Sequence, residues 1–275
     1  MRAIRKSGRA LSFAGKLLVG LLIISPVLLG LSLSFMSASE LASIPPHFLP
    51  SMPTSNAYQK VLASVPIFRF MANSFLVCGV VIAGQVITCS MAAYSFSFFQ
   101  FKGRKILFMV VLSTMMIPAD AIIISNYLTI SQWRLNDTYF ALVLPYLTSA
   151  MGIFLMRQSF LTIPKEIKEA SLLEGCSELR FLLRIAMPIS IPSVAALGVY
   201  VFIQTYNQFL WPLLVTNTQN MRTVQIGMDM LKNAEATDYS VVLAGAVIIL
   251  VPVIFVFIFG QRYLVKGMTA GGVKG

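Results

Sequence analysis

Residues that could perform chemistry are few in this 275-residue chain, and they are scattered. The one histidine, His47, lies in a proline-rich stretch with no second metal ligand nearby. Of the three cysteines, Cys78 and Cys89 lie in an apolar run where buried structural thiols are expected, and none pairs with Cys176 as C-x-x-C. The phosphate-binding pattern G-x-x-x-x-G-K-[ST] does not occur. The sequence therefore predicts no catalytic residue, no metal site and no cofactor.

A denser group of polar side chains interrupts an apolar stretch near residue 205. Gln204, Asn207, Gln208 and Trp211 have the i, i+3, i+4, i+7 spacing of one helix face, and Tyr206 lies among them. Amide, hydroxyl and indole groups suit a sugar or polyol, so these five residues are candidates for a substrate pathway. Interhelical hydrogen bonding, worth roughly 0.6–2 kcal/mol each, explains any single one of them equally well. Weaker candidates on an earlier apolar stretch are Asn73, Gln85 and Thr88.

The elements that must position these side chains are strongly apolar. Hydrophobic residues make up 57% of the chain and charged residues 11%, less than half the charge of an average soluble domain. A soluble enzyme and a disordered chain are thereby excluded. Six stretches approach or exceed the ~20 residues that cross a bilayer as a helix: Leu17–Phe35, Ala72–Phe96, Ile106–Leu128, Tyr139–Phe160, Pro188–Val215 and Val241–Gly260. We expect a kink in the third at Pro118, and Asp120 to end a helix at the outer surface.

The distribution of charge predicts the orientation. The net charge is +11, and with the N-terminus inside, 16 of the 21 basic residues lie on the inner side. Basic loops mark the cytoplasmic face. The sequence therefore predicts an all-α, polytopic membrane protein with six transmembrane helices, both termini in the cytoplasm and no role in binding nucleic acid.

The inner segment 162–188 is unusually long and reads as two short helices. Pro164 suits a helix start, Gly175 can turn the chain out of the first helix, and Ser177 can cap a second one that ends before Pro188. Such a pair could fill a groove in another protein or lie on the lipid surface. Four acidic residues stand among five basic ones, counting Arg157 just before the segment, and this balance favours the protein partner.

This segment carries a resemblance. Glu169-Ala-Ser-Leu-Leu-Glu-Gly175, then nine residues, then Ile185-Ala-Met-Pro188 resembles the EAA signature of ABC-importer permeases. The chain departs from that pattern at Ser171, Glu174 and Met187. The similarity covers nearly the whole length and includes the 206–214 stretch. It is greatest to the second permease subunit of maltose-type importers and to glycerol-3-phosphate permeases of the same group.

The resemblance implies a type I ABC-importer (MetI-like) permease fold. Residues 1–71 would form an N-terminal transmembrane helix and an extracytoplasmic loop. Residues 72–263 would form the transmembrane domain with its coupling loop at 162–188, and residues 264–275 a short cytoplasmic tail.

The resemblance also implies partners: a second permease subunit, a cytoplasmic ATP-binding-cassette ATPase dimer and an extracytoplasmic solute-binding protein. The chain itself would not be an enzyme. Glu169 would contact the ATPase, Ala170 would fill its cleft and Gly175 would make the turn; Ser171 occupies the second small-residue position, and Ile185 and Pro188 complete the signature. A carbohydrate, whether sugar or oligosaccharide, or glycerol-3-phosphate would be the substrate.

Two other classes of function are weaker. A secondary transporter or channel is expected to carry charged side chains at mid-membrane depth and inverted repeats. A membrane-embedded enzyme would need ionisable groups clustered at one depth. The six apolar stretches offer neither pattern.

Overall fold

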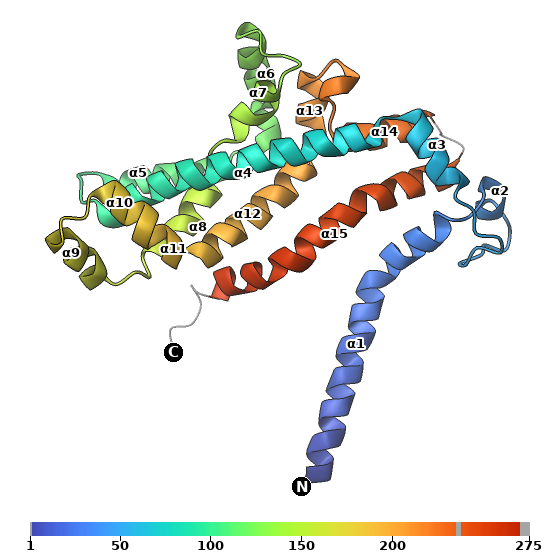
Figure 1. Cartoon of the computed structure of the whole chain (residues 1–275), viewed down its shortest axis with the longest axis horizontal. Helices are drawn as coiled ribbons and strands as arrows, with labels where there is room; N and C mark the ends of the chain where they lie inside the picture. The colour runs from blue at the N-terminus through green and yellow to red at the C-terminus, as the bar shows by residue number, and fades with distance from the viewer. Residues whose placement is uncertain (1, 235–237, 270–275) are drawn as a thin grey trace. The chain divides into compact units, whose positions relative to one another are not determined.

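The computed structural model describes residues 2–234 and 238–269 (Figure 1). Within these residues every regular element is helical, which confirms the predicted all-α class. The chain divides into two compact units: residues 1–67 with 227–251, and residues 68–226 with 252–275. The sequence-based boundaries at 71/72 and 263/264 stay a prediction, and residues 270–275 of the expected tail lie outside the described part.

The first unit contains α1 (Arg2–Leu33), α2 (Ala38–Leu41), α3 (Asn56–Ser64), most of α14 (Val224–Ala234) and the first part of α15 (Tyr239–Thr269). Tyr58 of α3 lies within hydrogen-bonding distance of Ser34, at the end of α1, with 2.7 Å between the two hydroxyl oxygens. Lys60 of α3 forms an ion pair of 2.7 Å with Asp238, immediately before α15. Polar contacts thus join the first unit's helices near their ends.

The second unit is built on α4 (Ile67–Phe98). Its other helices are α5 (Arg104–Ser113), α6 (Ile123–Gln132), α7 (Tyr139–Val143), α8 (Ala150–Phe160), α9 (Lys165–Leu173), α10 (Glu178–Phe181), α11 (Met187–Ile189), α12 (Ile191–Tyr206) and α13 (Leu210–Val215). A π-helical turn, Leu182–Ala186, joins α10 to α11, and short 3₁₀ turns occupy Thr114–Met116, Ala119–Ile122, Leu144–Tyr146 and Gln219–Met221.

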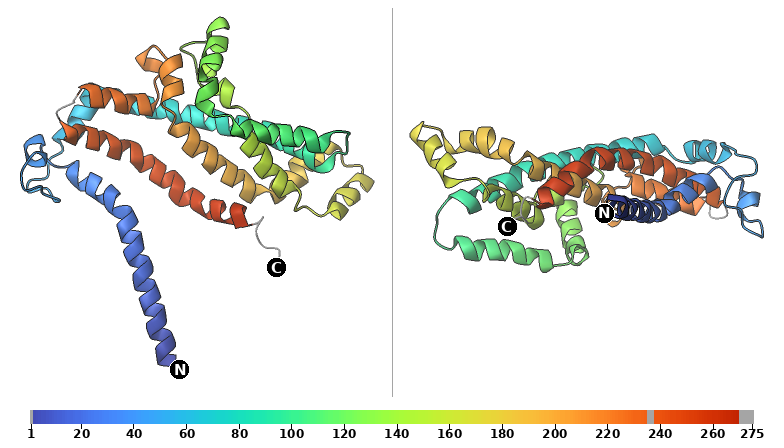
Figure 2. Two further views of the ribbon diagram at one scale, coloured as in Figure 1. Left: turned by 180° about the vertical axis from the view of Figure 1, so that it is seen from behind. Right: turned by 90° about the horizontal axis from the view of Figure 1, so that it is seen from below.

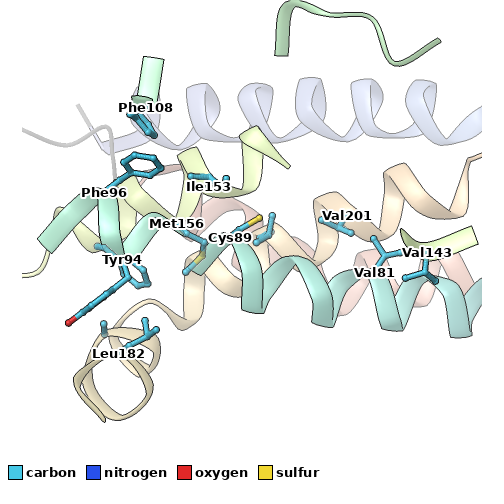
Figure 3. Close-up of a cluster of buried hydrophobic side chains, with 14 of the residues drawn as sticks. Val81, Cys89, Tyr94, Phe96, Phe108, Val143, Ile153, Met156, Leu182 and Val201 are labelled. Atoms are coloured by element: carbon cyan, nitrogen blue, oxygen red, sulfur yellow. The ribbon is translucent and has the colours of Figure 1, made fainter. Parts of the chain in front are cut away.

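Small side chains allow α4 to pack closely on its neighbours in this unit. The thiol of buried Cys89 lies against Gly152 of α8, and Cys78 is buried beside α12, where its thiol faces the carbonyl of Phe202. The buried core extends from here through Met156 of α8 to Leu182 (Figure 3). The α9–α10 segment lies at the Phe98 end of α4 (Figures 1 and 2).

Six membrane spans fit the described residues when each bent pair of helices is counted as one. Three single helices are long and apolar enough: Gly15–Leu33, Ile67–Phe98 and Tyr239–Gln261. Three bent pairs also qualify: Arg104–Met116 with Asp120–Gln132 at 89°, Tyr139–Tyr146 with Ala150–Phe160 at 52°, and Glu178–Ile189 with Ile191–Tyr206 at 79°. The break expected at Pro118 is confirmed.

The apolar stretches Tyr139–Phe160 and Pro188–Val215 also contain helix breaks, which were not predicted from the sequence. In the first, Pro145 has no N–H to donate, and Ser149 caps a new helix by accepting a 3.0 Å hydrogen bond from Gly152 N–H. In the second, α12 begins after Ser190 and ends at Tyr206. There the side chain of Asn207 donates a 2.9 Å hydrogen bond to the Ile203 carbonyl, which competes with helix continuation.

Candidate functional site

The α9–α10 segment has the turn that its sequence predicts. Gly175 has φ +74°, a left-handed conformation that favours glycine. Its N–H donates to the Leu172 carbonyl at 3.0 Å, and the N–H of Cys176 donates to the Ser171 carbonyl at 2.9 Å. These two bonds form a Schellman motif, which satisfies carbonyls that the helix end leaves free. The chain is therefore turned by backbone bonds at Gly175.

The second helix of the segment starts as predicted. The Ser177 hydroxyl accepts a 3.4 Å hydrogen bond from Arg180 N–H and caps α10. After it, Ile185 is half-buried against the core, whereas Pro188 is exposed within α11. Two short helices joined by a fixed turn thus stand at the end of the second unit, and the 79° bend at Ser190 separates the second of them from α12.

The first of these helices leaves apolar side chains uncovered. Ile167, Ala170 and Leu173, which follow i, i+3, i+6 spacing, are all exposed, and Leu173 is 91% exposed. Glu169 is exposed beside them. Ser171 instead is buried, and its hydroxyl donates a 2.7 Å hydrogen bond to the Lys168 carbonyl. The structure thus puts Glu169 and Ala170 on an open surface and turns Ser171 inward.

A second candidate region is a cavity of about 560 Å³ in the same unit. Three helix interruptions supply much of its lining. Thr114, Met115 and Asp120 flank the break between α5 and α6, and Ser149 with Ala150 lies at the start of α8. Residues at and after the end of α12 also line it: Gln204, Thr205, Gln208, Phe209, Leu210 and Trp211. Non-helical backbone within a membrane is tolerated where protein buries it or where it lines a cavity, which the convergence of these breaks satisfies.

The structure brings only some of the predicted pathway residues to this cavity. Gln204, Gln208 and Trp211 line it. Tyr206 is buried instead and stacks on Phe202, with ring centroids 5.3 Å apart. Asn207 caps α12 and accepts a 3.4 Å hydrogen bond from Gln225. The expected single helix face is wrong here because α12 ends before Asn207.

The signal for that break was present in the sequence. Pro212 has no N–H, and within a helix its ring would clash with the carbonyl of Gln208, four residues earlier. A helix through residues 206–212 is therefore disfavoured, and α13 instead places Pro212 in its first turn.

The weaker candidates on α4 also separate into two groups. Gln85 lines the cavity, accepting a 2.7 Å hydrogen bond from Ser149 and donating one of 2.9 Å to the Tyr146 carbonyl. Asn73 is buried and bonded at both ends of its amide, to carbonyls after α13 and to Tyr139. Thr88 donates to the Leu147 carbonyl at 2.6 Å. Asn73 and Thr88 therefore have structural partners.

Some lining residues were not identified from the sequence. Tyr146, Ser149 and Tyr200 lie on different elements and come together only in the fold. Asp120 was expected to end a helix, but it lies in the first turn of a 3₁₀ helix and lines the cavity. Among the described residues around the cavity, Asp120 is the one acidic residue; no lysine, arginine or histidine lines it.

Comparison with known proteins agrees with these features. Residues 61–270 match the family described as the binding-protein-dependent transport system inner membrane component. The arabinooligosaccharides transport system permease protein AraQ of Halalkalibacterium halodurans is 31% identical over 98% of this chain and 99% of its own. The sn-glycerol-3-phosphate transport system permease protein UgpE of Brucella abortus is 34% identical over 92% of this chain and 93% of its own.

The fold also has a counterpart among solved structures. A chain of a bacterial ABC transporter involved in the import of alginate superposes with a TM-score of 0.80, at 23% identity, covering 94% of this chain and 97% of that one. Its likeness concerns the fold alone. On the match over residues 61–270 and the relatives along nearly its full length, the chain belongs to the family of inner membrane components of binding-protein-dependent transport systems, and is a multi-pass membrane permease.

Proposed function

We propose that this chain works as one of two permease subunits of an ATP-binding-cassette importer, and that its α9–α10 segment docks onto the cytoplasmic ATPase. A separate solute-binding protein would deliver the substrate from outside. Closure of the ATPase dimer on ATP would move the docked segment and turn the pathway from inward-facing to outward-facing. The exposed apolar face of α9 is the observation that carries this proposal.

The surface of α9 suits a protein cleft. Exposed leucines are costly to leave in water when they are grouped, and Leu173 lies with Leu172 beside the Gly175 turn. Glu169 supplies a carboxylate at the edge of this apolar surface. A short helix with apolar anchors and a polar rim matches the helix-in-groove mode of recognition.

This role requires the α9–α10 segment to face the cytoplasm. The charge distribution along the sequence supports that side, because the loops on the α9 side carry most of the lysines and arginines. The basic side chains of residues 2–9 and 262–274, which contribute to this count, lie outside the described side chains.

For the substrate we propose an uncharged carbohydrate. One relative is named for arabinooligosaccharides and another for sn-glycerol-3-phosphate, so the relatives alone do not choose between these two substrate classes. A phosphate ester would favour basic groups around it. The cavity presents the carboxylate of Asp120 together with amides, hydroxyls and the Trp211 ring, which suit hydroxyl groups and sugar C–H faces.

Membrane vesicles that contain the chain with its companion subunits test the proposal. ATP-dependent uptake of radiolabelled arabinotriose is expected, competed by excess arabinotriose and unaffected by excess glycerol-3-phosphate. The Glu169→Lys variant is expected to insert normally but to lose its co-purifying ATPase. Uptake driven by an ion gradient in the absence of ATP would contradict the assignment and favour a secondary transporter. ATP-dependent uptake of radiolabelled glycerol-3-phosphate in place of arabinotriose would overturn only the substrate class.

A further inference from the structure

The two helices of the α9–α10 segment are held to α4 by one largely buried lysine side chain. The ammonium group of Lys168 on α9 donates a 2.7 Å hydrogen bond to the hydroxyl oxygen of Tyr94 on α4. It also forms an ion pair with Glu178 on α10. Tyr94 in turn donates its hydroxyl proton to the same Glu178 carboxylate oxygen. The three side chains therefore form a closed triangle across three helices.

The surroundings of the triangle make it a firm attachment. The side chain of Lys168 is only 12% exposed although it lies on a short helix at the end of the unit, whereas that of Glu178 is 44% exposed. Its ammonium lies 4.4 Å from the centre of the Phe181 ring, within the range of a cation–π contact. Tyr94 is buried among the rings of Phe98 and Phe160 and points toward the helical segment that carries Leu182 (Figure 3).

A buried charge needs compensation, and here the compensation is shared between elements. If Lys168 moved away with α9 alone, Glu178 would lose its ion pair. The Tyr94 hydroxyl oxygen would lose the ammonium group that donates a hydrogen bond to it. If α4 moved alone, both charges would lose the Tyr94 hydroxyl. Relative motion of these helices is thus opposed by groups from all three.

We propose that Lys168, Tyr94 and Glu178 form a clamp that makes the α9–α10 segment and the adjacent end of α4 move as one body. Movement of the ATPase would thereby be transmitted to the membrane-spanning helices. This inference rests on the proposed function. Because α4 also lines the cavity through Gln85, the clamp connects the docking surface with the candidate pathway by a single helix. Tyr94, Lys168 and Glu178 are positioning residues in this account, since none lies on the α9 surface proposed to meet the ATPase.

The test measures transport and ATP hydrolysis together in proteoliposomes that hold the complete importer and its binding protein. Lys168→Met keeps the alkyl stem and removes the charge, and Tyr94→Phe keeps the ring and removes the hydroxyl. In both variants we expect the ATPase to co-purify and hydrolysis to continue. Arabinotriose transported per ATP is expected to fall about tenfold, a size typical of coupling between two sites.

Two further variants separate coupling from a general loss of structure. Lys165→Met removes an exposed lysine one turn earlier on α9 and is expected to leave the amount of arabinotriose transported per ATP unchanged. Lys168→Glu combined with Glu178→Lys reverses the ion pair and is expected to regain most of the ratio that Lys168→Glu alone loses. If Lys168→Met prevents assembly, Tyr94→Phe decides the matter.

The clamp is overturned if Tyr94→Phe transports as much per ATP as the wild type. It is also overturned if Lys168→Met and Tyr94→Phe lose transport only in proportion to ATPase association, because that result means a structural role. A wild-type complex without a bound ATPase would instead contradict the proposed function itself, and the clamp with it.

Discussion

The indole N–H of Trp211 donates a 3.0 Å hydrogen bond to the carbonyl of Ala141, seventy residues earlier in the chain. Within a helix this carbonyl would bond to the N–H of residue 145, but Pro145 has none. Trp211 therefore satisfies a buried acceptor that a proline leaves free. The proline break after α7 and the chain after α12 are thus joined at the edge of the cavity.

Trp211→Phe tests this relationship. The variant keeps a ring but leaves the Ala141 carbonyl buried without its donor, which costs about 1–3 kcal/mol of unfolding free energy. Thermal unfolding in detergent is expected to show a lower midpoint than the wild type. Trp133→Phe, at a site that is 61% exposed, is the control and is expected to leave the midpoint in place. Equal midpoints for Trp211→Phe and wild type would contradict the structural role.

Two glycines form a matched pair for the packing of α4. A Cβ atom at Gly152 would lie 2.7 Å from the Cys89 sulfur and 2.9 Å from the Ser149 hydroxyl, whereas nothing lies within 4 Å at Gly79. Gly152→Ala is expected to destabilise the protein by about 1–3 kcal/mol through overpacking. Gly79→Ala is expected to be neutral or to stabilise by up to about 1 kcal/mol, because alanine favours helices. The same unfolding assay measures both, and the reverse order would show that the α4–α8 contact is wrong.

The turn at Gly175 gives a prediction for coupling. Proline fixes φ near −65° and has no N–H, so Gly175→Pro removes both the left-handed turn and the bond to Leu172. Uptake is expected to be abolished while the protein still inserts into the membrane. Gly175→Asn is the control, since asparagine tolerates the left-handed region, and it is expected to keep most of the uptake. Normal uptake by the proline variant would remove the turn from the mechanism.

Leu173 separates docking from folding. Because it is 91% exposed, Leu173→Ala is expected to change the stability of the isolated chain very little. Its affinity for the ATPase is expected to fall by roughly ten- to a hundredfold, the effect of losing about 1.5–3 kcal/mol of leucine burial. Leu49→Ala, at a residue of the first unit that is 75% exposed, serves as the control. Pull-down of the ATPase with each variant gives the measurement, and equal recovery would argue that α9 does not enter the cleft.

Asp137 gives a prediction about pH. The backbone N–H of Thr218 lowers the pKa of its carboxyl, helped by the N–H of Asn217, the Thr218 hydroxyl and the nearby Arg222, and these outweigh the effect of burial. A lowered pKa in the folded state means that this stabilisation is present above the unfolded value of about 3.9 and is lost as pH falls through the folded value.

Asp137→Asn removes the charge, and asparagine tolerates the residue's φ of +59°. The variant is expected to be less stable than the wild type at pH 7, by about 1 kcal/mol given its partial exposure. The difference is expected to narrow toward pH 3. Unfolding midpoints at both pH values check this, and a constant difference would mean that the charge is not involved.

Features encoded by neighbouring residues could be predicted from the sequence. The apolar stretches, the Pro118 break, the Gly175 turn and the Ser177 cap each depend on a few adjacent residues, and the structure contains all of them. The end of α12 depends on Pro212, which the helical spacing of Gln204 to Trp211 concealed. The contact of Tyr94 with Glu178 joins residues 84 positions apart, and no local pattern encodes such a pair. Polar contacts between residues far apart in the chain could therefore not be predicted from the sequence.

The way in which the bend after α9 is specified has a consequence for redesign. Its shape depends on the missing side chain of Gly175 and on backbone bonds, while the outward residues of α9 contribute little to holding it. If α9 binds the ATPase as proposed, folding and partner choice are encoded by different positions. Exchanging only the outward positions of α9 should then allow the permease to bind the ATPase of another importer while its own fold is unchanged.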